Sequence, residues 1–221
     1  MITVLQQRAM KYGLRELLSL KRKINLDQGL DCFYFGYGAN LSIDRFKKWN
    51  IPAEVVGPAF IKDHMLKFNL PCEYKGKGYA GIEHEAGQTV WGILFKVNES
   101  ALKMLDVLEW VPFSFYERKL FDVSHDNEIY TNVHAYVTCH PKKNLVPSKG
   151  YLDYIISEGK KADFPETYLS YLSSIQSESS FELDPTFVLR NPSQSRLFSD
   201  KLGKLYLQHD VLREKLTKVI P

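Results

Sequence analysis

The segment CFYFGYGANL, at residues 32 to 41, combines an apolar run with a glycine-containing loop. Its first five residues predict a strand, and the residues that follow are compatible with a helix. Gly36 and Gly38 permit positive φ angles and close approach of a ligand, and Asn40 tolerates the left-handed region. Consecutive backbone N–H groups could then converge on one anionic or carbonyl oxygen. An ordinary tight turn is the alternative interpretation of so short a motif.

A second candidate for chemistry is Glu109, which lies between Leu108 and the apolar residues 110 to 113. Asn98 predicts the N-cap of a helix from Glu99 to Leu108, which places Glu109 at the C-terminal end of that helix. Desolvation there would raise the pKa of the carboxyl group and make it a stronger base. The alternative is a surface glutamate at a helix terminus.

The loop resembles the motif Y-F-x-Y-G-[ST]-N-L, which opens the γ-glutamylcyclotransferase family. Three further groups of residues agree with that family in order and spacing. They are Gly81-Ile82 with Val90-Trp91-Gly92; LDVLE at 105 to 109 with Tyr116; and Pro147-Ser148 with Tyr151, Ile155, Gly159, Pro165 and Tyr168. The resemblance covers residues 33 to 176.

The resemblance implies an enzyme that cyclises a γ-glutamyl donor to 5-oxoproline and releases an amine or amino acid. It is an acyltransferase or lyase type of reaction that needs no cofactor and no metal. The family's catalytic glutamate matches Glu109, and Asp106 keeps the family's offset from it. The residues expected to bind substrate are Tyr37, Gly38, Ala39, Asn40, Leu41 and Tyr116.

Cyclotransfer requires little machinery, because the donor's own α-amine is the nucleophile that closes a five-membered ring. Glu109 is expected to act first as base and then as acid, and backbone N–H groups from Gly38 to Asn40 are expected to bind the donor's oxygens. The substrate class includes γ-glutamyl amino acids, γ-glutamylamines and biosynthetic γ-glutamylated intermediates. Within glutathione metabolism, glutathione itself is the less favoured substrate.

Two departures from the family pattern are visible. Ala39 replaces the usual serine or threonine of the loop, which leaves backbone recognition intact but removes a hydroxyl group. Val107 and Leu108 replace residues that are often polar in relatives, which predicts a drier pocket around Glu109.

Length and composition favour one main domain, since 221 residues with 44% hydrophobic residues can bury a full core. The expected division is an N-terminal helical extension at 1 to 30, the γ-glutamylcyclotransferase-like domain at 31 to 176, and a linker with a C-terminal helix at 177 to 221. The fold implied by the resemblance is mixed α/β (α+β), a small partly closed β-barrel flanked by helices.

Local patterns predict the elements of this domain. Strands are expected at 55 to 69 with an interruption at Gly57-Pro58, at 79 to 83 and 89 to 97 across a turn at 85 to 88, and at 118 to 123 and 132 to 138 across a second turn. Helices are expected at 43 to 49 after Ser42, after Pro147-Ser148, and from Pro165 to about 175. Outside the domain, helices are predicted at 3 to 22 and 201 to 219.

Several other functions are disfavoured. The net charge of +3 is spread along the chain, whereas nucleic-acid binding would want a sustained basic stripe. No window approaches a membrane span, and the N-terminal segment lacks the apolar core of a signal peptide. The three isolated cysteines indicate a reduced cytoplasm. The match of residues 76 to 81 to GxGxxG leads into a strand rather than a helix, which indicates a turn.

The partner expected is therefore a small γ-glutamyl molecule, with a homodimer possible. A second reading, from a different functional class, is a non-catalytic module that retains the pocket and uses the terminal extensions to recognise a partner. Joint retention of Glu109 and Tyr116 argues against it. An occluded Glu109 would favour it.

Overall fold

A computed structural model describes residues 29–72, 74, 76–111 and 114–180. The helices predicted at 3 to 22 and 201 to 219 lie outside the described residues. In chain order, the strands are β1 (Cys32–Gly36), β2 (Ala53–Pro71), β3 (Gly78–Val97), β4 (Tyr116–His125) and β5 (Glu128–Thr138). The helices are η1 (Ala39–Leu41, a 3₁₀ turn), α2 (Ile43–Trp49), α3 (Glu99–Leu108), α4 (Lys149–Lys161) and α5 (Glu166–Ser174).

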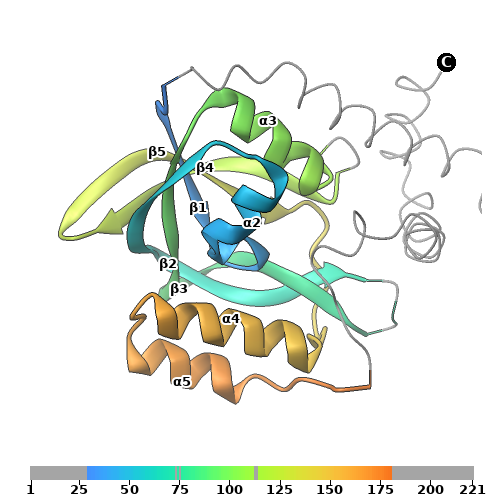
Figure 1. Ribbon diagram of the computed structural model, residues 1–221. Coiled ribbons are helices and arrows are strands. Elements are labelled where there is room, and N and C mark those ends of the chain that lie inside the picture. Colours follow the sequence, from blue (N-terminus) through green and yellow to red (C-terminus); the bar gives the residue numbers. More distant parts are fainter. Residues whose placement is uncertain (1–28, 73, 75, 112–113, 181–221) are drawn as a thin grey trace, which may run out of the picture.

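The five strands form a closed barrel in the order β1-β3-β2-β4-β5 (Figure 1). All neighbours are antiparallel except β1 and β5, which close the barrel in parallel where Tyr34 lies opposite His134. The predicted mixed α/β barrel flanked by helices is confirmed, and the barrel is fully rather than partly closed. Closure leaves each of the five strands with a partner on both sides.

The turn predicted at residues 85 to 88 is wrong, because β3 continues through these residues and pairs with β2 on both sides of them. The register shifts there, since Lys62 lies opposite Thr89 but His64 lies opposite His84. Asp63 and Gly87 both have positive φ angles, 55° and 77°, and the Asp63 carboxylate accepts the Gly87 N–H at 2.8 Å. This bulge bends the two long strands without reversing the chain.

The break expected at Gly57-Pro58 is likewise a bulge within β2. The second hairpin is confirmed, because β4 and β5 pair directly and are joined by Asp126 and Asn127. Both of these residues have positive φ angles, as two-residue hairpin turns require. The hairpin projects from the barrel (Figure 1).

The predicted helix starts are confirmed by their caps. The side chains of Ser42, Asn98 and Ser148 accept backbone N–H groups in the first turns of α2, α3 and α4. Pro165 precedes α5. Within the described residues, no helix combines the length and apolar character needed to cross a membrane.

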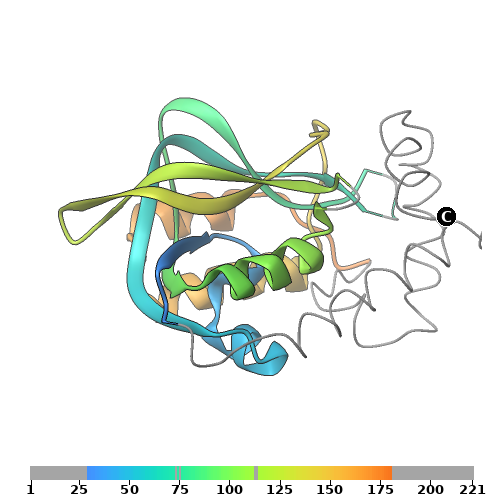
Figure 2. The ribbon, with the colours of Figure 1, turned by 90° about the horizontal axis from the view of Figure 1, so that it is seen from above.

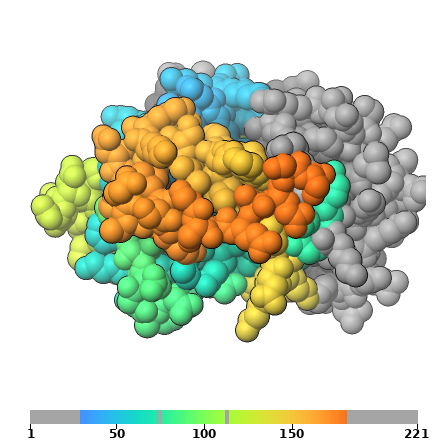
Figure 3. All heavy atoms as spheres, turned by 90° about the horizontal axis from the view of Figure 1, so that it is seen from below, coloured from blue at the N-terminus to red at the C-terminus, as the bar shows by residue number. Residues whose placement is uncertain are grey.

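Helices α4 and α5 lie side by side against one face of the barrel, which Figure 3 views from outside and Figure 2 from the opposite direction. The α4 residue Tyr151 meets the rings of Phe68 and Tyr79 edge-on, at 5.9 Å between centroids in each case. From α5, the Tyr171 hydroxyl donates to the Leu66 carbonyl oxygen at 2.8 Å. The two helices are thereby tied to β2 and β3.

The core lies inside the barrel and under α2 and α3. Phe46 of α2 packs on Phe95 of β3, with 4.6 Å between ring centroids, and both side chains are almost fully buried. Burying a side chain of this size contributes about 1.5–3 kcal/mol. These aromatic contacts hold α2, and the loop that precedes it, against the barrel.

Close packing of β1 on β3 explains one glycine. A Cβ atom on Gly92 would lie 2.4 Å from the Gly36 carbonyl oxygen and 2.6 Å from the Phe35 ring. Gly36 is the last residue of β1, so the position of the following loop depends on this contact.

We predict that Gly92→Ala lowers the free energy of unfolding by about 1–3 kcal/mol, because the added methyl group overpacks the β1–β3 contact. Urea unfolding measures this change. Gly29→Ala is the matched control, since no atom lies within 4 Å of the added Cβ. Equal stability of the two variants would contradict the packing argument.

Candidate functional site

The loop after β1 has a different backbone from the one predicted. The positive φ angles expected at Gly36 and Gly38 are wrong, as is the left-handed region for Asn40: Gly38 has φ −125° and Asn40 has φ −95°. Both glycines lie close to other parts of the chain, and at Gly36 there is no room for a side chain. A Cβ on Gly36 would lie 2.4 Å from the Asn40 carbonyl oxygen, and one on Gly38 would lie 3.0 Å from the Tyr151 hydroxyl. The loop folds back over β1 as the turn η1.

Glu109 is placed by the end of α3, as predicted. It is the C-cap residue, and its backbone N–H donates to the Leu105 carbonyl oxygen at 2.8 Å. Trp110 then adopts a positive φ of 55°, which turns the chain away from the helix axis. Glu109 as a whole residue is half-buried.

The structure brings Glu109 and the loop together through Asn40. The Asn40 side-chain nitrogen Nδ2 donates to Glu109 Oε1 at 2.8 Å and to the Tyr34 hydroxyl oxygen at 2.8 Å. Asn40 itself is buried. A carboxylate from the end of one helix is therefore held directly against the glycine loop, although the two lie far apart in the sequence.

Burial raises the pKa of the Glu109 carboxyl group, because loss of water disfavours its charged form. The positive charge of Arg45 and the hydrogen bond from Asn40 act in the opposite direction, and the negative charge of Asp106 raises the pKa further. The net shift is upward. Such a carboxylate is a better proton acceptor than an exposed glutamate.

Buried tyrosines surround this carboxylate. Burial raises the pKa of the Tyr34, Tyr37, Tyr136 and Tyr151 hydroxyls, and the charge of Glu109 adds to the increase in each case. These hydroxyls therefore stay neutral at physiological pH. They can give or accept hydrogen bonds at the site, but they are poor bases.

Two of the predicted substrate-binding tyrosines are anchored to the barrel. The Tyr37 hydroxyl donates to the Tyr136 carbonyl oxygen and the Tyr116 hydroxyl donates to the Ala80 carbonyl oxygen, each at 2.6 Å. Leu41 is buried in the core. Contacts between these three residues and a substrate stay predictions.

Helix α4 supports the loop from the other side. The Tyr154 hydroxyl donates to the Ala39 carbonyl oxygen at 3.1 Å. The bond uses the backbone of Ala39, so the residue that departs from the family pattern is held independently of its side chain. Gly38 lies beside Tyr151 of the same helix.

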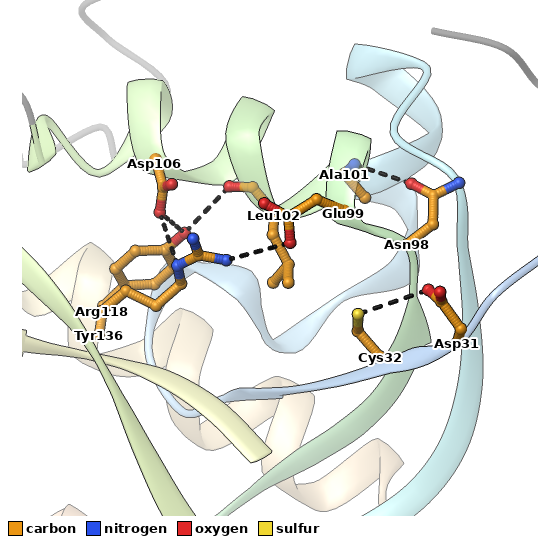
Figure 4. A network of polar contacts seen from close by, with 9 residues as sticks. All are labelled: Asp31, Cys32, Asn98, Glu99, Ala101, Leu102, Asp106, Arg118 and Tyr136. Atoms are coloured by element: carbon orange, nitrogen blue, oxygen red, sulfur yellow. Dashed lines mark hydrogen bonds and ion pairs between the residues drawn. The ribbon is translucent and has the colours of Figure 1, made fainter. Parts of the chain in front are cut away.

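A polar network joins α3 to β4 and β5 beside the site (Figure 4). The Asp106 carboxylate forms an ion pair with Arg118 at 3.2 Å and accepts a hydrogen bond from the Tyr136 hydroxyl group at 2.8 Å. Because the Tyr136 backbone in turn accepts from Tyr37, the network connects the helix that carries Glu109 to the glycine loop.

The sequence analysis identified Asp106 by its spacing from Glu109 but missed Tyr34, Arg45, Arg118 and Tyr136. Alternation in the strands indicates which face a residue occupies but not its partner across the barrel. Tyr34 lies within the quoted motif, and its buried hydroxyl could have been noted there. Within the described ranges, no cluster of His, Cys, Asp and Glu could hold a metal ion.

Comparison with known proteins identifies similar sequences. Residues 89–172 match the model of the AIG2-like family. The chain is 29% identical to the gamma-glutamylcyclotransferase of Bos taurus in an alignment of 157 residues that covers 67% of this chain and 80% of that protein. It is 28% identical to the gamma-glutamylcyclotransferase of Homo sapiens, over 65% of this chain and 78% of that protein.

Solved structures extend the match to three dimensions. A structure of a gamma-glutamyl cyclotransferase superposes with a TM-score of 0.62 at 22% identity, over 80% of this chain and 99% of the other. An uncharacterized protein from Homo sapiens superposes with a TM-score of 0.62 at 25% identity, over 70% of this chain and 94% of the other. The resemblance inferred from the sequence is confirmed: the chain is a relative of the γ-glutamylcyclotransferases, and its described domain has their fold.

Proposed function

We propose that this protein is a γ-glutamylcyclotransferase that converts a γ-glutamyl donor into 5-oxoproline and a free amine or amino acid. The observation that carries the proposal is the 2.8 Å hydrogen bond that holds Glu109 against Asn40 of the glycine loop. A carboxyl group of raised pKa thus lies beside the segment that is expected to bind the donor. The names of the related proteins support the same reaction.

In the proposed reaction, the α-amine of the donor attacks its own γ-carbonyl carbon. A new C–N bond closes the ring while the original γ-amide C–N bond breaks. Glu109 accepts a proton from the attacking nitrogen and delivers a proton to the departing nitrogen, so one carboxyl group serves both steps. Backbone N–H groups of Gly38, Ala39 and Asn40 are proposed to stabilise the oxyanion that develops on the carbonyl oxygen.

The substrate is proposed to be a γ-glutamyl amino acid, a γ-glutamylamine or a biosynthetic γ-glutamylated intermediate. Incubation with a panel of these compounds, followed by an assay for 5-oxoproline, tests the function directly. The non-catalytic reading has no observation in its favour. Cytoplasmic location, a homodimer and the absence of nucleic-acid binding stay predictions from the sequence.

We predict that Glu109→Gln reduces turnover by about 10²–10⁴, because an amide of the same shape cannot accept the amine proton. The variant should be at least as stable as the wild type at neutral pH. The raised pKa means that the charged carboxylate costs stability once the pH exceeds the ordinary glutamate value, and this cost disappears with the charge. 5-Oxoproline release and thermal unfolding measure the two effects. Near wild-type turnover would remove Glu109 from the mechanism.

We predict that Asp106→Asn moves the acidic limb of the pH profile of kcat/KM to lower pH. Asp106 raises the pKa of Glu109 through its negative charge, so its neutralisation lowers that pKa and keeps the base ionised in more acidic solution. Asparagine retains an oxygen that can accept the Tyr136 hydroxyl proton. Asp122→Asn, which removes an exposed carboxylate of β4, is the matched control and should leave the limb in place. A limb that moves upward would contradict the assignment of the limb to Glu109.

We predict that Ala39→Ser has a small effect on kcat/KM for every substrate of the panel, because the loop acts through its backbone. The change in transition-state free energy calculated from kcat/KM should be less than roughly 1 kcal/mol. The Tyr154 bond to the Ala39 carbonyl oxygen is preserved in the variant. A tenfold change in the ratio of kcat/KM between two substrates would instead show that a hydroxyl group at this position contacts the donor.

A further inference from the structure

The side-chain carbonyl oxygen of Asn40 is a buried acceptor without a hydrogen-bond donor in the part of the chain that the structure describes. Asn40 is only 5% exposed, so its amide is almost completely removed from bulk water. Buried polar atoms in folded proteins nearly always have a partner, and those that lack one require an explanation. The position of this atom beside Glu109 suggests one in the function of the site.

The orientation of the amide is fixed by its other end. Nδ2 donates to both Glu109 and the Tyr34 hydroxyl, each at 2.8 Å, which uses both of its hydrogens. Rotation of the amide by 180° would bring Oδ1 against the Glu109 carboxylate, and two acceptors would then face each other. Oδ1 is therefore directed away from Glu109 while it remains next to the base.

Three tyrosine hydroxyl groups of the site donate their hydrogen bonds to backbone carbonyl oxygens. Those of Tyr37, Tyr116 and Tyr154 donate to the carbonyl oxygens of Tyr136, Ala80 and Ala39, respectively. None of these three hydroxyl groups therefore donates a hydrogen bond to Asn40 Oδ1, which lies beside the Glu109 carboxylate. An N–H group of a bound molecule would supply the donor that this acceptor lacks.

We propose that Asn40 Oδ1 accepts a hydrogen bond from the α-amino group of the γ-glutamyl donor. This inference rests on the proposed function. An α-ammonium group has three N–H donors, enough to reach both Glu109 and Asn40. Glu109 removes one proton from the ammonium group. A second N–H group stays hydrogen-bonded to Asn40 Oδ1 and fixes the position of the nitrogen, whose lone pair attacks the γ-carbonyl carbon. Asn40 is thereby the residue that selects donors with a free α-amine.

The experiment compares two ligands that differ in this amine alone. The Glu109→Gln variant, which turns over slowly, is titrated with a γ-glutamyl amide and with the matching glutaryl amide, in which hydrogen replaces the α-amino group. We expect the γ-glutamyl compound to bind at least about tenfold more tightly, in line with a hydrogen bond to a charged group. In Glu109→Gln/Asn40→Ala the two dissociation constants should differ by no more than about twofold.

Asn69→Ala, in the same Glu109→Gln background, is the matched control. Asn69 is also a buried asparagine, 2% exposed, but both ends of its amide have partners. Its Nδ2 donates to Glu83 at 2.8 Å, and its Oδ1 accepts from Thr138 at 2.7 Å. This variant should lose stability and keep the tenfold preference. Asn40→Ser provides a second test of Asn40 in case the alanine variant does not fold.

The outcomes separate the two proposals. If the wild type releases 5-oxoproline but the preference for the amine survives Asn40→Ala and Asn40→Ser, the role of Asn40 is overturned and the function stands. If both dissociation constants rise equally, Asn40 acts only through Glu109 or a structural water, which also overturns the inference. If the wild type releases no 5-oxoproline from any γ-glutamyl compound, the function falls and the inference falls with it.

Discussion

The hydrogen bond between Asn40 and Glu109 is the contact on which the arrangement of the site depends. It joins a 3₁₀ turn that follows β1 to the last turn of α3, two segments that otherwise pack on different parts of the barrel. Each end is held by contacts of its own, one by Phe46 packed on Phe95 and the other by the bonds of Asp106 to Arg118 and Tyr136. A contact between two rigidly held groups loses little conformational entropy when it forms, which suits a site that must hold its geometry.

The surroundings of Glu109 act on its pKa in opposite directions. Burial among tyrosines raises the pKa of Glu109, whereas Arg45 and Asn40 limit that increase. The balance leaves a group that can both take and return a proton. Such placement is unfavourable for stability, because a buried charge is only partly compensated, and it is the kind of local cost that functional sites commonly carry.

The sequence predicted those parts of the fold that depend on neighbouring residues in the chain. Caps at Ser42, Asn98 and Ser148 fixed the helix starts, and alternation fixed the β4–β5 hairpin. It failed at residues 85 to 88, where a glycine with positive φ indicates a turn but serves a bulge within paired strands. It also expected a positive φ angle at Gly38, which has φ −125° and lies beside Tyr151. Both errors concern contacts with distant segments, which local patterns do not encode.

Closure of the barrel has a consequence for how the protein acquires activity. The short strand β1 leads directly into the glycine loop, and its pairing with β5 joins two strands that lie far apart in the sequence. The bond from Tyr37 to Tyr136 spans 99 residues, so its formation requires the closing of a long chain loop. Partly folded chains that contain the β2–β3 and β4–β5 pairs would still lack the assembled loop and base. Under the proposed function, activity therefore requires a complete barrel, and its recovery during refolding should lag behind the formation of secondary structure.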